Sequence, residues 1–174
     1  MPDPGGIITL DLSLSTGWAY GCVRDSNPIS GVWVLPSQAR NSAAPYVALE
    51  NELEDAIARY RPHQVVCATP LLAKRQTTHR LLIGLTITTE SCCYRQGIDY
   101  REQAEQTIRK AVLGRASFPR GQMKVAVLDW CRARGWNLDN DDEADARVVW
   151  QYAVDLVRNT PRPRGRNASQ ELPA

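Results

Sequence analysis

The order in which hydrophobic residues change their spacing limits the fold of this chain more than any other feature. Three segments near the N-terminus, 7–12, 17–23 and 29–35, have the apolar and β-branched residues of strands, and a turn-rich stretch separates the last two. The next segment, 42–60, has hydrophobic residues at intervals of three and four, as amphipathic helices do. The sequence therefore predicts antiparallel strands followed by a helix.

Strand-like and helix-like segments then alternate to the end of the chain. Short strands are expected at 64–68 and 98–101. Helices are expected at 81–94, 103–113 and 123–134, and in a closing segment that leaves the acidic stretch 137–145 and ends near Arg158. Antiparallel strands followed by strand–helix–strand units indicate an α/β fold with a mixed, five-stranded sheet flanked by helices.

Length and composition favour one folded domain. The 174 residues are 43% apolar and 23% charged, which excludes fibrous and disordered classes. We expect the domain to span 1–158 and a mobile, Arg- and Pro-rich tail to occupy 159–174. The net charge is only +2, so the distribution of charge matters more than its sum. No stretch is apolar for long enough to cross a membrane.

Cysteine and histidine content limits the compartment and the kind of metal site. The chain has five cysteines without CxxC spacing and only two histidines, so a zinc site or a Ser-His-Asp triad is poorly supplied. The N-terminus lacks the basic region and apolar run of a signal peptide. We therefore expect reduced thiols in a cytoplasmic protein, and any metal should be a hard cation bound by carboxylates.

The first candidate functional residue is Asp11, at the end of the first expected strand. A carboxylate in a central strand is costly to bury unless it is paired or binds a cation. Alternatively, Asp11 caps the Ser- and Thr-rich turn that follows it, since Asp is common in turns. This residue alone leaves both interpretations open.

The second candidate is the acidic stretch 139–145, which contains five carboxylates. Acids at a helix start can cap free N–H groups and suit the helix dipole, which accounts for one or two of them. Capping does not explain why Asp145 shares a helix face with Asp142, because two like charges there repel unless a cation lies between them. Together with Asp11, this pair predicts carboxylates that converge from a strand and a helix, as a Mg²⁺ site requires.

A basic segment precedes these acids. From 101 to 134 there are eight Lys or Arg and three Asp or Glu, an excess of five positive charges. Cations that bind a phosphate backbone beside acids that bind a metal are typical of enzymes that act on nucleic acids. The alternative for any single arginine is an ordinary solvated helix face.

Five segments, in this order along the chain, resemble the RuvC-type Holliday-junction resolvases, and most closely their compact phage forms. They are Ile-Thr-Leu-Asp-Leu-Ser-Leu-Ser-Thr-Gly-Trp-Ala, Gln-Val-Val-Cys-Ala-Thr-Pro, Ile-Arg-Lys-Ala-Val-Leu-Gly, Gln-Met-Lys-Val-Ala-Val and Asp-Asp-Glu-Ala-Asp-Ala. The resemblance extends from about 7 to 150 and so covers most of the chain.

The resemblance implies a ribonuclease-H-like fold, a homodimer, and paired nicks across a four-way DNA junction. It also implies Mg²⁺, with Mn²⁺ as a substitute, at two ions per active site. The metal-binding aspartates of the family match Asp11, Asp142 and Asp145. A family lysine near the active site matches Lys124.

DNA contacts are expected from a basic segment at 109–114 that matches a junction-facing segment of the family. The side chains expected to hold phosphates are Arg75, Arg80, Arg109, Lys110, Arg115 and, at the scissile phosphate, Lys124. Two symmetric nicks require a twofold axis, and we expect the dimer interface on an apolar helix face near 81–85.

One position departs from the family pattern V-V-x-E-x-P, because Ala68 stands where the family has a catalytic glutamate. A methyl group cannot bind a metal, so we expect cleavage to be severely reduced or absent. Either the residue is an inactivating substitution in a nuclease, or the protein naturally binds without cutting. Glu90 is an alternative ligand by its charge, but its place on the following helix favours a surface role.

Two alternatives belong to other functional classes. The chain could be a module that binds branched DNA without nuclease activity, its acids serving only as helix caps. The run that starts at Asp11 also looks like the first phosphate loop of actin-like sugar kinases. That fold requires a second loop of the D-x-G-G kind and a much longer chain, and this sequence has neither.

Overall fold

The computed structural model describes residues 5–39, 41–69 and 75–160, and most of the tail expected at 159–174 lies outside them. Within the described residues, five strands form one sheet in the order β3-β2-β1-β4-β5. The strands are β1 (Gly6–Asp11), β2 (Ser15–Cys22), β3 (Ile29–Val34), β4 (Gln64–Thr69) and β5 (Asp99–Ala104). β1, β2 and β3 pair antiparallel, while β4 is parallel to both β1 and β5. The prediction of a mixed, five-stranded sheet in an α/β fold is confirmed.

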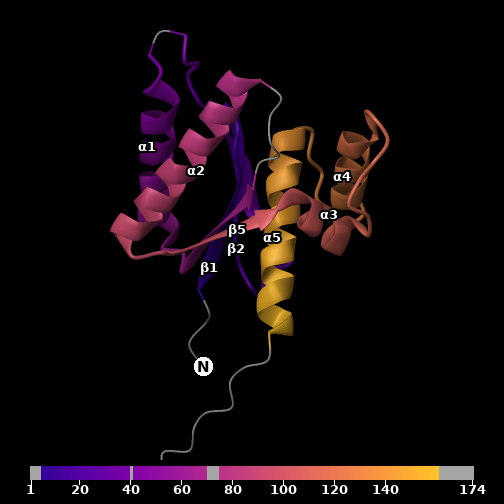
Figure 1. Ribbon diagram of the computed structural model, residues 1–174. Helices are drawn as coiled ribbons and strands as arrows, with labels where there is room; N and C mark the ends of the chain where they lie inside the picture. The colour runs from indigo at the N-terminus through magenta and orange to yellow at the C-terminus, as the bar shows by residue number, and fades with distance from the viewer. Residues whose placement is uncertain (1–4, 40, 70–74, 161–174) are drawn as a thin grey trace, which may run out of the picture.

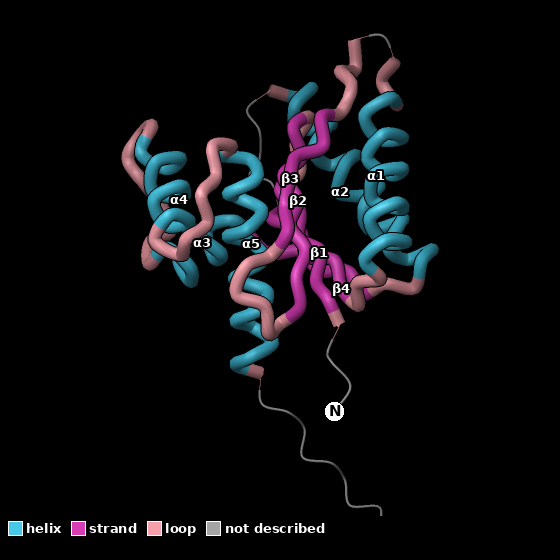
Figure 2. Tube along the Cα trace, turned by 180° about the vertical axis from the view of Figure 1, so that it is seen from behind, coloured by secondary structure: helices cyan, strands magenta, loops and turns pink. Residues whose placement is uncertain are grey.

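Helices cover both faces of the sheet (Figures 1 and 2). The helices are α1 (Ala44–Tyr60), α2 (Gln76–Gln96), α3 (Glu105–Leu113), α4 (Gln122–Arg132) and α5 (Asp141–Asn159). α1 and α2 lie on one side, and α5 lies on the other with α3 and α4 beside it. All of these helices were expected from the sequence, with ends that differ by a few residues.

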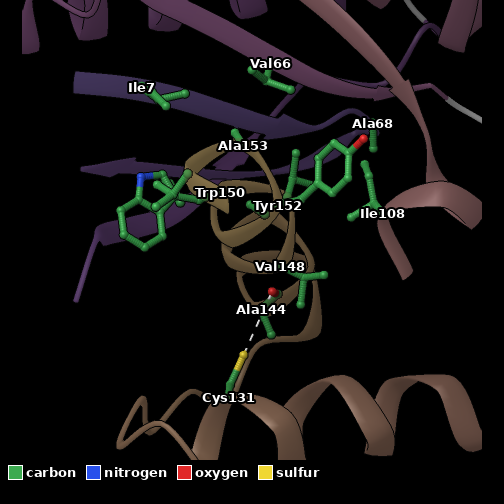
Figure 3. Close-up of a cluster of buried hydrophobic side chains, with 14 of the residues drawn as sticks. Ile7, Val66, Ala68, Ile108, Cys131, Ala144, Val148, Trp150, Tyr152 and Ala153 are labelled. Carbon is green, nitrogen blue, oxygen red and sulfur yellow. Dashed lines mark hydrogen bonds between the residues drawn. The ribbon is translucent and has the colours of Figure 1, made fainter. Parts of the chain in front are cut away.

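Each face of the sheet has its own hydrophobic core. Around α5 the core contains Trp150 and Val149 together with Ile7 from β1, and Figure 3 shows Ala68 and Ile108 at one edge of it. The core under α1 and α2 contains Ile8 from the same strand. Because β1 is buried on both faces, it has a continuous apolar run rather than an alternating one.

The largest differences from the expected boundaries are explained by polar residues. α2 begins at Gln76 rather than near 81, because its first turn is polar and exposed and so gives no hydrophobic signal. β5 extends to Ala104 rather than 101, because it is an edge strand with exposed side chains. The sequence pattern therefore missed the polar first turn of α2 and the polar end of β5.

The dimer interface expected near 81–85 stays a prediction, and two of the apolar residues in that range are not available to it. Leu81 and Leu85 are buried in the core that lies under α1 and α2. A residue that already packs inside its own chain cannot form a contact with a second copy. The apolar side chains that α2 does expose are Ile83 and Ile87.

Two simpler expectations concern the thiols and the membrane. Among the residues that the structure describes, no disulfide joins any two of the five cysteines, and four of the five, Cys67, Cys92, Cys93 and Cys131, are buried. Among the helices that the structure describes, none combines the length and the apolar character that a bilayer-spanning segment requires.

Gly17 allows the start of α5 to approach the sheet. It pairs with Asp11 across β1 and β2, and a Cβ at this position would lie 1.8 Å from the backbone carbonyl oxygen of Asp142. Real side chains never approach so closely, so any residue larger than glycine would push α5 away. The contact therefore places Asp142 and Asp145 near the end of β1.

We expect Gly17→Ala to destabilise the protein by about 1–3 kcal/mol, because the added methyl group meets rigid backbone. Urea unfolding at equilibrium measures this difference. Gly31→Ala on β3 is the matched control, because its Cβ would meet the Trp18 side chain at 3.0 Å, and a side chain can move aside. Equal losses of stability in the two variants would contradict the role assigned to Gly17.

Candidate active site

A pocket of about 260 Å³ lies where β1 and β4 end and α3 begins. Three acids and one arginine line it together with apolar residues. The apolar residues come from β4, α3 and α5. The lining residues are Asp11, Ala68, Glu105, Ile108, Arg109, Asp145, Val148 and Val149. The structure therefore brings together Asp11, Ala68 and Asp145, which the sequence analysis had singled out separately.

Asp11 is the last residue of β1, and its carboxylate accepts no hydrogen bond from any described residue. The pKa of Asp11 is raised from 3.8 to about 8, first by burial and then by the nearby carboxylates of Asp145, Glu105 and Asp142, while Arg109 opposes them. The interpretation of Asp11 as a cap for the following turn has no hydrogen bond to support it. Thr16 and Ser13 make the contacts within that turn.

The cap of α5 is made by Asn140, whose side-chain oxygen accepts the backbone N–H of Glu143 at 3.1 Å. Two of the acids in this stretch have other partners, since Asp141 pairs with Lys124 and Glu143 accepts from the Ser30 hydroxyl. Capping therefore does not account for Asp142 and Asp145.

Asp145 faces the pocket from the first turns of α5. Its pKa is raised to about 7, mainly by burial and then by nearby carboxylates of which Glu105 is the first, while Arg109 opposes the rise. No described residue donates a hydrogen bond to its carboxylate or forms an ion pair with it. Asp11 and Asp145 thus form neither a hydrogen bond nor an ion pair with a described residue, and Arg109 offsets their charge only in part, which is costly unless a cation joins them.

Asp142 lies beside the pocket rather than in its wall. Its charge raises the pKa of both Asp11 and Asp145, so its carboxylate is close to both of them. Its backbone carbonyl packs against Gly17. The three aspartates expected to meet therefore do approach one another at the carboxyl end of β1.

Glu105 is the functional candidate that the sequence analysis did not identify. It is the first residue of α3, lines the pocket, and forms an ion pair with Arg109 at 2.6 Å across one helical turn. Both side chains are mostly buried, with 20% of Glu105 and 16% of Arg109 exposed. Its one sequence signal was its position just after the strand that neighbours β4, which only the parallel pairing makes meaningful.

The basic residues divide into two groups. Arg109 lies inside the pocket, so it faces the acids and not the solvent. The others are exposed, and they lie at the start of α2, on the outer side of α3 and beyond its end, and on α4: Arg75, Arg80, Lys110, Arg115 and Lys124. Lys124 is held at the rim by Asp141, which raises the pKa of the lysine. Helix α3 thus has an inner side that lines the pocket and an outer side with Lys110.

The pocket suits a hard divalent cation in its chemistry, because its polar side chains other than Arg109 are all carboxylates. Arg109 forms an ion pair with one of these carboxylates, Glu105. In the part of the chain that the structure describes, no three His, Cys, Asp or Glu side chains are grouped closely enough to hold an ion as they stand. Cation binding therefore requires the carboxylates to close around the ion, and Glu105 can join them only by leaving Arg109.

The sequence matches no family model, and no curated protein matches it either. Solved structures do match. The structure of Thermus thermophilus RuvC has a TM-score of 0.69 at 11% identity, over 88% of this chain and 95% of that one. T. thermophilus RuvC in complex with a Holliday junction substrate has a TM-score of 0.70 at 12% identity, over the same 88% and 95%. The chain has the ribonuclease-H-like fold.

A third solved structure with this fold is the yeast mitochondrial Holliday junction resolvase Ydc2, with a TM-score of 0.53 at 14% identity over 88% of this chain and 83% of that one. The ribonuclease-H-like fold was expected from the resemblance in the sequence, and this expectation is confirmed. In this ribonuclease-H-like sheet, the pocket lies at the carboxyl ends of two adjacent parallel strands, β1 and β4.

Proposed function

We propose that this protein binds four-way branched DNA as a homodimer, with the active-site plan of a Mg²⁺-dependent endonuclease that makes paired nicks. The single observation that carries the proposal is the meeting of Asp11 and Asp145, two partly buried carboxylates that form no hydrogen bond or ion pair with a described residue, in one pocket of a ribonuclease-H-like fold. A solved neighbour with this fold is bound to a Holliday junction substrate.

Asp11 and Asp145 would hold the cation, with Asp142 on its outer side. When bound, Mg²⁺ would lower the pKa of the attacking water and stabilise charge on the leaving oxygen. The apolar side chains of Ile108 and Val148 limit the access of bulk water to the carboxylates. Ala68 offers no oxygen ligand, so we propose that cleavage by this chain is strongly reduced.

The exposed basic residues would bind the DNA backbone. Lys110 and Arg115 follow the pocket-lining residues of α3, and Lys124 lies at the rim beside Asp141. Arginine can hold a phosphate through two parallel hydrogen bonds, which fixes the orientation of the backbone. These residues thus lie where a DNA strand that enters the pocket would meet them.

The test of DNA binding is a comparison of a four-way junction with a linear duplex of the same length. We expect the junction to bind more tightly, and binding to weaken steeply with salt. Replacing both Lys110 and Arg115 by Ala should weaken junction binding about tenfold and reduce the salt slope by about 2, one for each lost phosphate contact. Fluorescence anisotropy between 50 and 200 mM salt, roughly the range in which such effects are clear, measures both.

Arg95→Ala is the control for this measurement. Arg95 ends α2, forms an ion pair with Glu50, and lies on the side of the sheet away from the pocket. Its loss removes one positive charge without touching the proposed DNA surface. A change of about 1 in the salt slope for Arg95→Ala, the same per charge removed, would show that net charge, and not the position of Lys110 and Arg115, determines binding.

The second candidate function is junction binding without any ancestral nuclease activity. Two observations favour it: Ala68 stands in the pocket wall, and Arg109 already balances part of the negative charge. Titration with Mn²⁺ in a calorimeter distinguishes the two candidates. Binding that Asp11→Asn abolishes supports the nuclease plan, whereas a flat titration supports the module.

A further inference from the structure

We infer that Glu105 is a ligand of the divalent cation and provides the carboxylate that position 68 lacks. The inference rests on the proposed function and adds a residue to it. The resemblance in the sequence implies a metal-binding carboxylate on β4, and the inference assigns this carboxylate to α3 instead. It concerns the retention of the ion, and it is compatible with weak cleavage, because Glu105 enters the pocket from a different element.

The pairing of the two strands places Glu105 beside the vacant position. β4 and β5 are parallel, with Ala68 opposite Gln103 and Thr69 opposite Ala104. The chain then turns directly into α3, whose first residue is Glu105. Tyr152 of α5 donates its hydroxyl to the side-chain oxygen of Gln103 at 3.0 Å, which holds this end of β5 against α5. Glu105 therefore leaves the sheet next to Ala68 and on the side of Asp145.

The surroundings of Glu105 are not those of an ordinary helix-start acid. The helix dipole and the ion pair with Arg109 both favour a glutamate at the first position of α3. Neither requires it to face a pocket in which Asp11 and Asp145 already lie. Three carboxylates in one small pocket repel one another, and a solvent-facing side chain would avoid this repulsion.

The ionised side chains of the pocket have an excess of negative charge, which a divalent cation would neutralise. Arg109 is the one basic residue among those that line it, against Asp11, Glu105 and Asp145, so the ionised pocket has an excess of two negative charges. The ion pair holds Glu105 at 2.6 Å from Arg109, while no described residue pairs with Asp11 or Asp145. A divalent cation would join these two aspartates and take Glu105 from Arg109.

The small side chain at position 68 leaves the space that this rearrangement requires. Ala68 contributes only a methyl group to the wall of the 260 Å³ pocket. A glutamate at 68 would reach into the same space and meet the carboxylate of Glu105. The alanine on β4 and the glutamate on α3 are thus complementary, because both residues line the pocket and only one of them brings a carboxylate.

The test is a double-mutant cycle read by Mn²⁺ binding to the full chain in a calorimeter. Glu105→Gln should weaken Mn²⁺ binding about tenfold or more in the native background, and much less in the Ala68→Glu background, where a second carboxylate is available. Glu105→Asp keeps the charge but shortens the side chain, and should also weaken binding. Glu90→Gln is the control, since Glu90 is exposed on α2 across the sheet and should change nothing.

Each outcome decides between the inference and the proposal beneath it. Equal weakening by Glu105→Gln in both backgrounds, or full retention by Glu105→Asp, means that Glu105 acts only through its charge and overturns the inference. If Asp11→Asn abolishes Mn²⁺ binding and Glu105→Gln leaves it intact, the inference is overturned and the proposed function stands. If Mn²⁺ binds only after Ala68→Glu, the inference is likewise overturned and the proposed function stands. Absence of Mn²⁺ binding in every variant overturns both. Circular dichroism of each variant confirms that it is folded.

Discussion

Replacement of Ala68 by Glu is expected to raise junction cleavage in Mg²⁺ by about 10²–10³-fold, the largest gain predicted for any single change in this protein. The register Leu10 to Cys67 between β1 and β4 places the next pair, Asp11 and Ala68, side by side at the end of the sheet. Both residues line the pocket, so a glutamate at 68 would bring a carboxylate directly beside that of Asp11.

The measurement is nicking of a labelled four-way junction under single-turnover conditions. Ala68→Gln is the matched control, because it adds the same length without a negative charge and should remain inactive. An inert Ala68→Glu protein, in a buffer where an unrelated resolvase cleaves the same junction, would mean that the aspartates do not form a metal site. Asp11→Asn in the Ala68→Glu background should abolish the gained activity.

The second large effect is that of Asp11→Asn on stability. This substitution should abolish cleavage in the Ala68→Glu background, but it should stabilise the folded protein. In chelating buffer, Asp11→Asn is expected to stabilise the protein at pH 8 by roughly 2–4 kcal/mol, after allowance for residual solvent screening. The pKa of Asp11 is about 8 in the folded protein and 3.8 in its ordinary state. Between these values the folded protein binds a proton that the unfolded chain has released, so the free energy of unfolding falls as pH rises from about 4 to 8.

Urea unfolding at a series of pH values measures this effect. Asp145, with a pKa of about 7, adds a similar fall that ends about one pH unit lower. Asp11→Asn should flatten most of the profile, and Asp129→Asn, which removes an exposed acid paired with Arg132, should leave it unchanged. Saturating Mn²⁺ should restore stability to the native protein at pH 8, because a ligand of the folded state stabilises it by mass action. A native profile that is flat from pH 5 to 8 would contradict the burial assigned to Asp11.

The sequence was sufficient for the sheet because the segments with the strongest hydrophobic patterns are also those with the most burial. β1 is apolar on both faces, and the pattern of α1 matches the residues that it buries, such as Leu49 and Leu53. β5 was shortened because an edge strand with exposed side chains gives little hydrophobic signal. Local pattern thus predicted β1 and α1 closely because they are well buried, and it shortened β5 because polar side chains dominate that strand.

The site was predictable in part. Asp11 and Asp145 were identified because an acid after an apolar strand, and an acid beyond a helix cap, are unusual locally. Glu105 was not identified, because a glutamate at a helix start is ordinary and its meaning depends on the pairing of β4 with β5. Arg109 was expected on the DNA surface, and its inward position depends on how α3 turns against α5. Such relations between distant segments are absent from local spacing.

The two sides of α3 have a consequence for any attempt to alter this protein. Nine residues hold both the pocket-facing pair of Glu105 and Arg109 and the outward-facing Lys110. Because the two sets of side chains lie on one short helix, a substitution that tilts α3 moves both of them. Affinity for nucleic acid and affinity for ions should therefore rise and fall together in variants of this helix, and neither is expected to be tunable alone.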